Sequence, residues 1–220
     1  LIRLRNGEYD QAIPNRSKVI ELGGGDGLVY GSLGYAYMNT EQYVSAESAY
    51  RQAVLLERET MDWKLGLTQS VFKQSKYAEA VALTEELIKK YPDRADFWLL
   101  QGNAYIGLGK PLEAAENFEL VQRMGEATPR SLKLLGDIYV NREMWDLATR
   151  AYGLAVAAKP DQPMSRPLQW VKILAQRGAF PQAQRLLNEV KDVYGDALDD
   201  ADRKELLKLE ARLALNEGEG

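Results

Sequence analysis

The sequence contains no cysteine and no histidine among its 220 residues. Without cysteine the chain can form no disulfide, thiolate nucleophile or sulfur metal ligand, and without histidine it loses the commonest general base and metal ligand. Most familiar hydrolase and metalloenzyme mechanisms are therefore excluded. We expect a protein that is not an enzyme and that uses no metal or other cofactor.

An excess of positive charge and long apolar runs are absent too. The chain has 28 Lys and Arg against 32 Asp and Glu, a net charge of −4, so nucleic acid is not an expected partner. No run of about 18 apolar residues occurs, so we expect no membrane insertion. A chain without cysteine suits the cytoplasm and the periplasm equally, so the localisation stays unknown.

The first residues, Leu1-Ile2-Arg3, include no Met and no signal-type segment. We therefore expect a fragment of a longer protein from which the native N-terminus is absent. The composition that remains, 45% hydrophobic and 27% charged residues, is that of a globular chain.

A repeat of about 34 residues organises this composition. One alanine series has four steps of 34 residues and a last step of 35: Ala12, Ala46, Ala80, Ala114, Ala148 and Ala183. A second series places small residues at Gly34, Thr68, Gly102 and Gly136. A fixed period of this length indicates a solenoid built from repeated supersecondary units.

Within each repeat the periodicity is helical, twice over. Tyr30, Gly34 and Tyr37 lie at i, i+4 and i+7, and a second helix repeats that spacing with Ala46, Tyr50 and Ala53. We therefore expect two amphipathic helices joined by a short turn, with Gly on one and Ala on the other where backbones approach closely. Aromatic side chains fill the space beside these small residues.

This 34-residue pattern of aromatic, Gly, Tyr, Ala, aromatic and Pro resembles the tetratricopeptide repeat family. The best matches are Tyr30, Leu33, Gly34, Tyr37, Tyr43, Ala46, Tyr50 and Ala53, and Leu132, Leu135, Gly136, Tyr139, Trp145, Ala148, Tyr152, Ala155 and Pro160. The sequence departs from the pattern where Val171 replaces a small residue, where Arg16 and Thr84 replace an aromatic, and where Pro14 falls inside a helix. We expect looser packing at these positions.

The resemblance implies an all-α, right-handed superhelical solenoid of antiparallel helix pairs, with about six repeats and a C-terminal helix. We expect a single solenoid over 1–220. Its expected divisions are a partial repeat at 1–26, full repeats at 27–60, 61–94, 95–128, 129–162 and 164–197, and the terminal helix of a truncated repeat at 198–220.

Two motifs suggest other functions. The segment from Val19 to Gly27, VIELGGGDG, resembles the glycine loop of nucleotide-type methyltransferases, but it lacks a preceding strand and reads better as a turn between repeats. Asp196, Asp199, Asp200 and Asp202 lack the glycine-centred loop of a calcium site, and acidic residues at a helix N-terminus explain them better.

The resemblance further implies a concave face made by the first helix of every repeat, which in this family commonly holds a peptide. By register this face presents Tyr35, Asn39, Gln69, Phe72, Lys73, Asn103, Ile106, Lys133, Asp137, Asn141 and Lys172, with apolar neighbours that include Leu168. Apolar side chains mixed with amides suit a peptide backbone. The Lys and Asn set that binds chaperone C-termini in one family subtype is absent.

We therefore predict a protein-interaction scaffold that binds a protein or peptide segment in its concave groove. The alternative is a regulatory or self-assembly segment of a larger enzyme. Unpaired apolar faces at the two ends of the solenoid also predict self-association through those ends.

Overall fold

The structure is a computed structural model that describes residues 9–158, 163–195 and 200–217. Within these ranges every regular element is a helix and no strand occurs, as the periodicity predicts. The elements are α2 (Tyr9–Glu21), α3 (Gly27–Asn39), α4 (Tyr43–Leu56), α5 (Met61–Lys73), α6 (Tyr77–Lys90), α7 (Ala95–Gly107), α8 (Pro111–Arg123), α9 (Pro129–Asn141), α10 (Trp145–Ala157), α11 (Ser165–Gln176), α12 (Phe180–Tyr194) and α13 (Asp200–Glu217).

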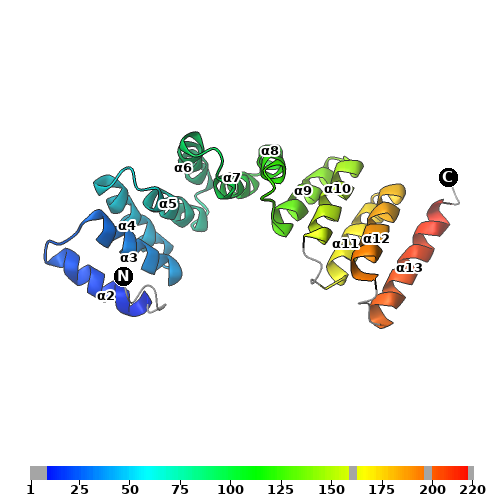
Figure 1. The fold of residues 1–220 in the computed structure, drawn as a ribbon, viewed down its shortest axis with the longest axis horizontal. Coiled ribbons are helices and arrows are strands. Elements are labelled where there is room, and N and C mark those ends of the chain that lie inside the picture. Colours follow the sequence, from blue (N-terminus) through cyan, green and yellow to red (C-terminus); the bar gives the residue numbers. More distant parts are fainter. Residues whose placement is uncertain (1–8, 159–162, 196–199, 218–220) are drawn as a thin grey trace. The chain divides into compact units, whose positions relative to one another are not determined.

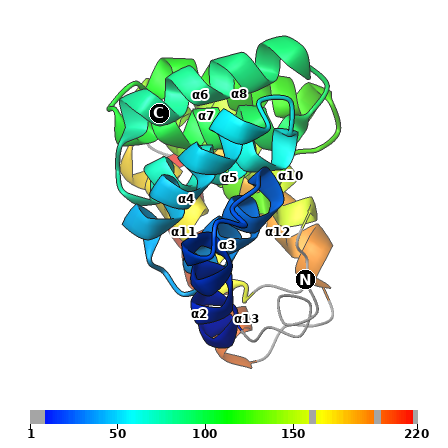
Figure 2. The same ribbon diagram turned by 90° about the vertical axis from the view of Figure 1, so that its left-hand side faces the viewer.

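The helices form two compact parts, the N-terminal part (residues 1–117) and the C-terminal part (residues 118–220). In the N-terminal part each helix from α2 to α6 packs against the next one along the chain (Figures 1 and 2). In the C-terminal part α9 packs against α10, and α12 packs against α10, α11 and α13. Helix pairs that contact mainly their neighbours are the arrangement that the repeat predicts.

The periodic alanines are buried. Ala46, Ala80, Ala114, Ala148 and Ala183 have no exposed surface, and Ala12 is 4% exposed. A methyl side chain lets two helix backbones approach closely, so the alanine series marks where helices of one repeat and the next meet.

Glycines on the first helix of a pair make room for tyrosine rings from the second. A Cβ atom at Gly34 would lie 2.9 Å from the Tyr50 ring, and one at Gly66 would lie 2.3 Å from the same ring. The Tyr50 ring therefore fits between α3 and α5, the first helices of two consecutive repeats. In the C-terminal part Tyr152 lies as closely against Gly136, at 2.4 Å from the position of a Cβ.

The turn inside each repeat has one repeated backbone geometry. Positive φ angles recur at Glu41, Ser75, Gly109, Glu143 and Gly178, again at steps of 34 and finally 35 residues. The residue after each of them donates its N–H to a carbonyl five residues back, as Gln42 does to Tyr37 at 2.9 Å. This is the Schellman ending of a helix, which places one residue in the left-handed region before the chain reverses.

The glycine-rich segment before α3 is a helix start and not a nucleotide loop. Asp26 caps α3, because its Oδ1 accepts the Val29 N–H at 2.7 Å. Gly23 has a φ of +81° and follows the last residues of α2. No strand precedes the segment within the described residues, so the turn interpretation holds.

The departures from the repeat pattern are accommodated inside the helices. Pro14 lies within α2. Thr84 and Val171 have no exposed surface, and the Thr84 hydroxyl donates to the Ala80 carbonyl at 2.8 Å. We expected looser packing at Thr84 and Val171, but neither side chain is exposed to solvent.

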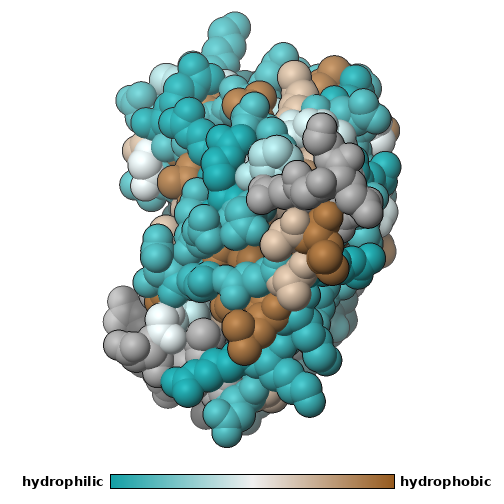
Figure 3. Space-filling view, turned by 90° about the vertical axis from the view of Figure 1, so that its right-hand side faces the viewer, coloured by the Kyte–Doolittle hydropathy of each residue, from teal (hydrophilic) through white to brown (hydrophobic). Residues whose placement is uncertain are grey.

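Helix α13 packs on α12 and α11 through one of its faces. Leu206 and Leu209 are 5% exposed and Leu213 is fully buried, whereas Leu207 and Leu215 are 63% and 74% exposed. The space-filling view of this end shows hydrophobic patches within a mainly hydrophilic surface (Figure 3). Of the acidic stretch before α13, Asp196 and Asp199 lie outside the described residues.

Candidate functional site

A groove opens in the N-terminal part between α3 and α5, the first helices of two consecutive repeats. This α3–α5 groove has a volume of about 570 Å³. It is lined by Tyr9, Leu28, Ser32, Tyr35, Tyr50, Asp62, Trp63, Leu65, Gly66 and Gln69. The size suits one or two large side chains of a ligand.

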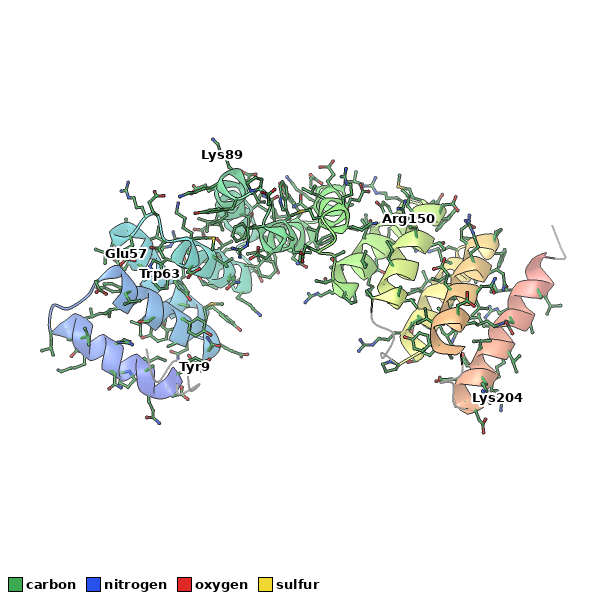
Figure 4. The ribbon with its side chains drawn as sticks, viewed as in Figure 1. Tyr9, Glu57, Trp63, Lys89, Arg150 and Lys204 are labelled. Carbon is green, nitrogen blue, oxygen red and sulfur yellow. The ribbon has the colours of Figure 1, made fainter. Side chains whose placement is uncertain are left out.

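Four aromatic residues line the α3–α5 groove. The Tyr9 and Tyr35 rings meet edge to face with centroids 5.8 Å apart, and the Tyr50 and Trp63 rings lie 6.5 Å apart. The Trp63 Nε1–H donates to Glu57 Oε2 at 3.0 Å, which holds this ring in place (Figure 4). Burial raises the pKa of Tyr50 well above its ordinary value, so its hydroxyl stays protonated.

A second groove lies in the C-terminal part between α9 and α11, again the first helices of consecutive repeats. This α9–α11 groove has a volume of about 610 Å³. It is lined by Pro129, Arg130, Lys133, Asp137, Arg166, Gln169, Trp170 and Ile173. One lining residue, Trp170, is 6% exposed, and its ring stacks on Tyr152 with centroids 5.1 Å apart and an interplanar angle of 10°.

The acidic group of the α9–α11 groove is already paired. Asp137 accepts the Tyr152 hydroxyl at 2.8 Å through Oδ1, and its Oδ2 forms an ion pair with Lys133. Burial raises the pKa of Tyr152, and the neighbouring Asp137 raises it further. Arg130 and Arg166 are exposed and form no ion pair with any described residue.

The structure brings four of the sequence-predicted residues to these grooves. Tyr35 and Gln69 line the α3–α5 groove, and Lys133 and Asp137 line the α9–α11 groove. Lys172 lines a smaller pocket between α11 and α13, where it forms an ion pair with Glu205.

The other predicted residues lie outside both grooves. Asn39 and Asn141 are exposed at the last turns of α3 and α9, and Lys73 lies 5.9 Å from the centre of the Tyr43 ring. Phe72 is half-buried against Tyr77.

On α7, two predicted residues are half-buried. The Asn103 amide donates to the Leu99 carbonyl at 2.7 Å, within its own helix, and Ile106 lies one turn further along α7. Leu168 is only 1% exposed, so its placement on the inner face was wrong and it belongs to the core.

The groove residues that the sequence did not predict lie mostly in the first turns of these helices. Asp62 and Trp63 lie in the first turn of α5, Arg130 in the first turn of α9, and Arg166 in the first turn of α11. The inner face was predicted from repeat positions in the middle and last turns of each helix, so the prediction did not include these first-turn positions. A signal was available: Leu28, Asp62 and Arg130 are separated by 34 and 68 residues, which are one and two periods of the repeat.

Two further features follow from the described part of the chain. It contains no group of three or more acidic side chains that could hold a metal ion. None of its helices combines the length and the apolar character needed to cross a bilayer.

An all-α chain of repeated helix pairs, with grooves between successive first helices, defines a helical-repeat protein. The family model described as tetratricopeptide repeat matches residues 32–95, 65–123 and 99–163. The chain belongs to the tetratricopeptide repeat family. Members of this family generally mediate protein–protein interactions and bind protein or peptide partners, and the family's scaffolds are typically non-catalytic.

Several solved structures share this fold at low sequence identity. PilF from Pseudomonas aeruginosa is 19% identical over 96% of this chain and 92% of its own, with a TM-score of 0.66. MamA from Desulfovibrio magneticus RS-1 is 18% identical over 73% of this chain and 90% of its own, with a TM-score of 0.67. YrrB, described as having an unusual peptide-binding site, is 16% identical over 89% and 97%, with a TM-score of 0.63. No curated protein gives a significant match.

Proposed function

We propose that this chain is a non-catalytic scaffold that binds extended segments of partner proteins on the first helices of its repeats. The observation that carries this proposal is the groove between consecutive first helices in each part, at about 570 Å³ and 610 Å³. Each groove combines apolar walls with polar side chains at its edge, which suits a peptide that inserts a side chain and leaves its backbone partly solvated.

The contact surface that we propose is wider than the two grooves. It includes polar and apolar side chains that lie further along the same helices and on α7, because within each part an extended peptide covers several helices at once. The complete set is Tyr35, Asn39, Gln69, Phe72, Lys73, Asn103, Ile106, Lys133, Asp137, Asn141 and Lys172, together with the groove residues Trp63, Arg130 and Arg166.

Selection from an unbiased peptide library on the purified chain tests this proposal. We expect the selected peptides to slow amide exchange in α3 and α5, or in α9 and α11. Replacing Tyr35 and Gln69 by Ala is expected to weaken a peptide of the first kind by about tenfold, since a groove side chain contributes roughly 1–2 kcal/mol to binding.

The matched control is Lys89→Ala on α6, an exposed residue that lines neither groove (Figure 4). It is expected to leave the affinity unchanged. Selected peptides that protect only the second helices α4, α6, α10 and α12, or a library that yields no ligand, would contradict the proposed function.

A further inference from the structure

The cations of the α9–α11 groove outnumber its anions. Arg130, Lys133 and Arg166 line it, and Asp137 is the one carboxylate among the lining residues. Because Lys133 and the Tyr152 hydroxyl already bind both oxygens of Asp137, that carboxylate is satisfied within the protein. The two arginines are exposed, line the groove from two different helices, and have no anionic partner among the described residues.

The same groove also presents an apolar surface. Pro129, Trp170 and Ile173 line the groove, and the stacking of Trp170 on Tyr152 fixes its indole from behind. A rigid, mostly apolar floor of this kind accepts an aromatic or large aliphatic side chain at little entropic cost. The guanidinium groups beside it can each bind a carboxylate through two parallel hydrogen bonds.

The α3–α5 groove provides an internal comparison. Its single charged lining residue is Asp62, and no Lys or Arg lines it. The two grooves therefore have similar volumes, apolar walls and opposite charge. Because the whole chain has a net charge of −4, the excess of cations in the α9–α11 groove is local and does not reflect the composition.

We infer that the α9–α11 groove binds an acidic segment of a partner protein, in which a large apolar side chain is flanked by Asp or Glu. The apolar side chain occupies the floor beside Trp170 and Ile173, and the flanking carboxylates pair with Arg130 and Arg166. This inference rests on the proposed function and adds the chemical class of the ligand for one of its two grooves.

The test uses a short fluorescein-labelled peptide in which one Phe is flanked by Asp and Glu, with fluorescence polarisation as the readout. We expect binding that weakens as salt increases, because exposed charge pairs are screened. The double variant R130E/R166E is expected to weaken binding at least about tenfold. If circular dichroism shows that this variant is misfolded, R130Q/R166Q is used, with loss of binding expected in the same direction.

Matched controls separate this groove from a general attraction. The variant K204E/K208E makes the same change of charge on exposed residues of α13 and is expected to bind the peptide normally (Figure 4). A peptide with Ala in place of Phe, and one with Lys in place of the acids, are both expected to bind weakly. Equal binding of either, or equally tight binding of a single-stranded oligonucleotide of the same charge, would overturn the inference.

The test distinguishes failure of this inference from failure of the proposed function. If the acidic peptide does not bind but library peptides protect α3 and α5 or bind α9 and α11 without acids, only the acidic class is wrong. If no peptide binds either groove, the proposed function fails as well.

Discussion

Among single residues, those that end the first helix of each repeat are under the most evident backbone strain. The left-handed position is a glycine at Gly109 and Gly178, but a larger residue at Glu41, Ser75 and Glu143. A side chain with a Cβ is disfavoured there because it approaches the following carbonyl oxygen. The repeats thus share one turn geometry without sharing the residue that suits it best.

Replacing Glu41 or Glu143 by Gly is therefore expected to stabilise the protein. We expect a gain of about 0.5–1 kcal/mol each, since relief of the left-handed strain exceeds the entropic cost of glycine in the unfolded chain. Urea denaturation followed by circular dichroism measures it. Ala82→Gly, at an exposed position in the interior of α6, is the control and should instead destabilise by about 0.5–1 kcal/mol. Equal destabilisation by all three changes would show that the turns carry no such strain.

At the scale of the helices, a network of charges joins two consecutive repeats in the N-terminal part. Glu47 on α4 is 9% exposed. It accepts hydrogen bonds from Arg51 at 2.8 Å, from Lys76 at 2.6 Å and from Gln74 at 2.7 Å. Since Gln74 and Lys76 belong to the turn between α5 and α6, these bonds attach that turn to the preceding repeat.

This network predicts a dependence of stability on acid. Burial acts to raise the pKa of Glu47, but the hydrogen bonds from Lys76, Arg51 and Gln74 outweigh it and lower the pKa from 4.5 to about 2. The stabilisation is therefore complete above about pH 4.5 and is lost as the pH falls toward 2. Glu47→Gln is expected to cost about 1–3 kcal/mol at pH 7 and to flatten the pH profile between pH 4.5 and 2.

Chemical denaturation at a series of pH values provides the measurement. Glu59→Gln is the matched control, because Glu59 forms an ion pair with Lys90 but its side chain is 84% exposed. Its removal should hardly change stability, as is usual for solvated pairs. A pH profile of Glu47→Gln that is parallel to that of the unaltered protein would contradict the assigned role of Glu47.

The sequence predicts the helices better than it predicts the grooves. The apolar period and the 34-residue alanine series predict the helix pairs, because both depend only on neighbours along the chain. The grooves depend on how far apart consecutive first helices lie, which is set by Tyr50 against Gly66 in one part and by Tyr152 against Trp170 in the other. That tertiary spacing extends the grooves as far as the first turns of the helices, so Trp63, Arg130 and Arg166 were missed.

For the molecule as a whole, the exposed apolar residues of α13 bear on self-association. Leu207 and Leu215 are 63% and 74% exposed, and the exposed Ala211 and Ala214 lie between them on the same side of α13. The spacing of i, i+4, i+7 and i+8 makes a continuous apolar stripe opposite the face that α13 buries. Such stripes favour contact with another apolar surface.

We therefore predict concentration-dependent self-association through α13. Sedimentation velocity at increasing protein concentration should show a growing dimer fraction, and L207Q/L215Q should remain monomeric with unchanged helicity. The control V44Q alters an equally exposed residue of α4, at 71%, and should associate like the unaltered chain. A strictly monomeric chain at high concentration would contradict this prediction.

The position of the Tyr50 ring between Gly34 and Gly66 also limits how such a chain can evolve. A larger residue at either glycine is tolerated only if the ring becomes smaller, because a Cβ at these positions would lie 2.9 Å and 2.3 Å from it. The three positions therefore have to change together, although they belong to two different repeats. A duplication that inserts a new repeat after α4 keeps this packing only if the incoming helix also offers a glycine opposite the ring. Replacement of a single repeat is thus restricted by the repeat that follows it, because the ring of one repeat packs against a glycine of the next.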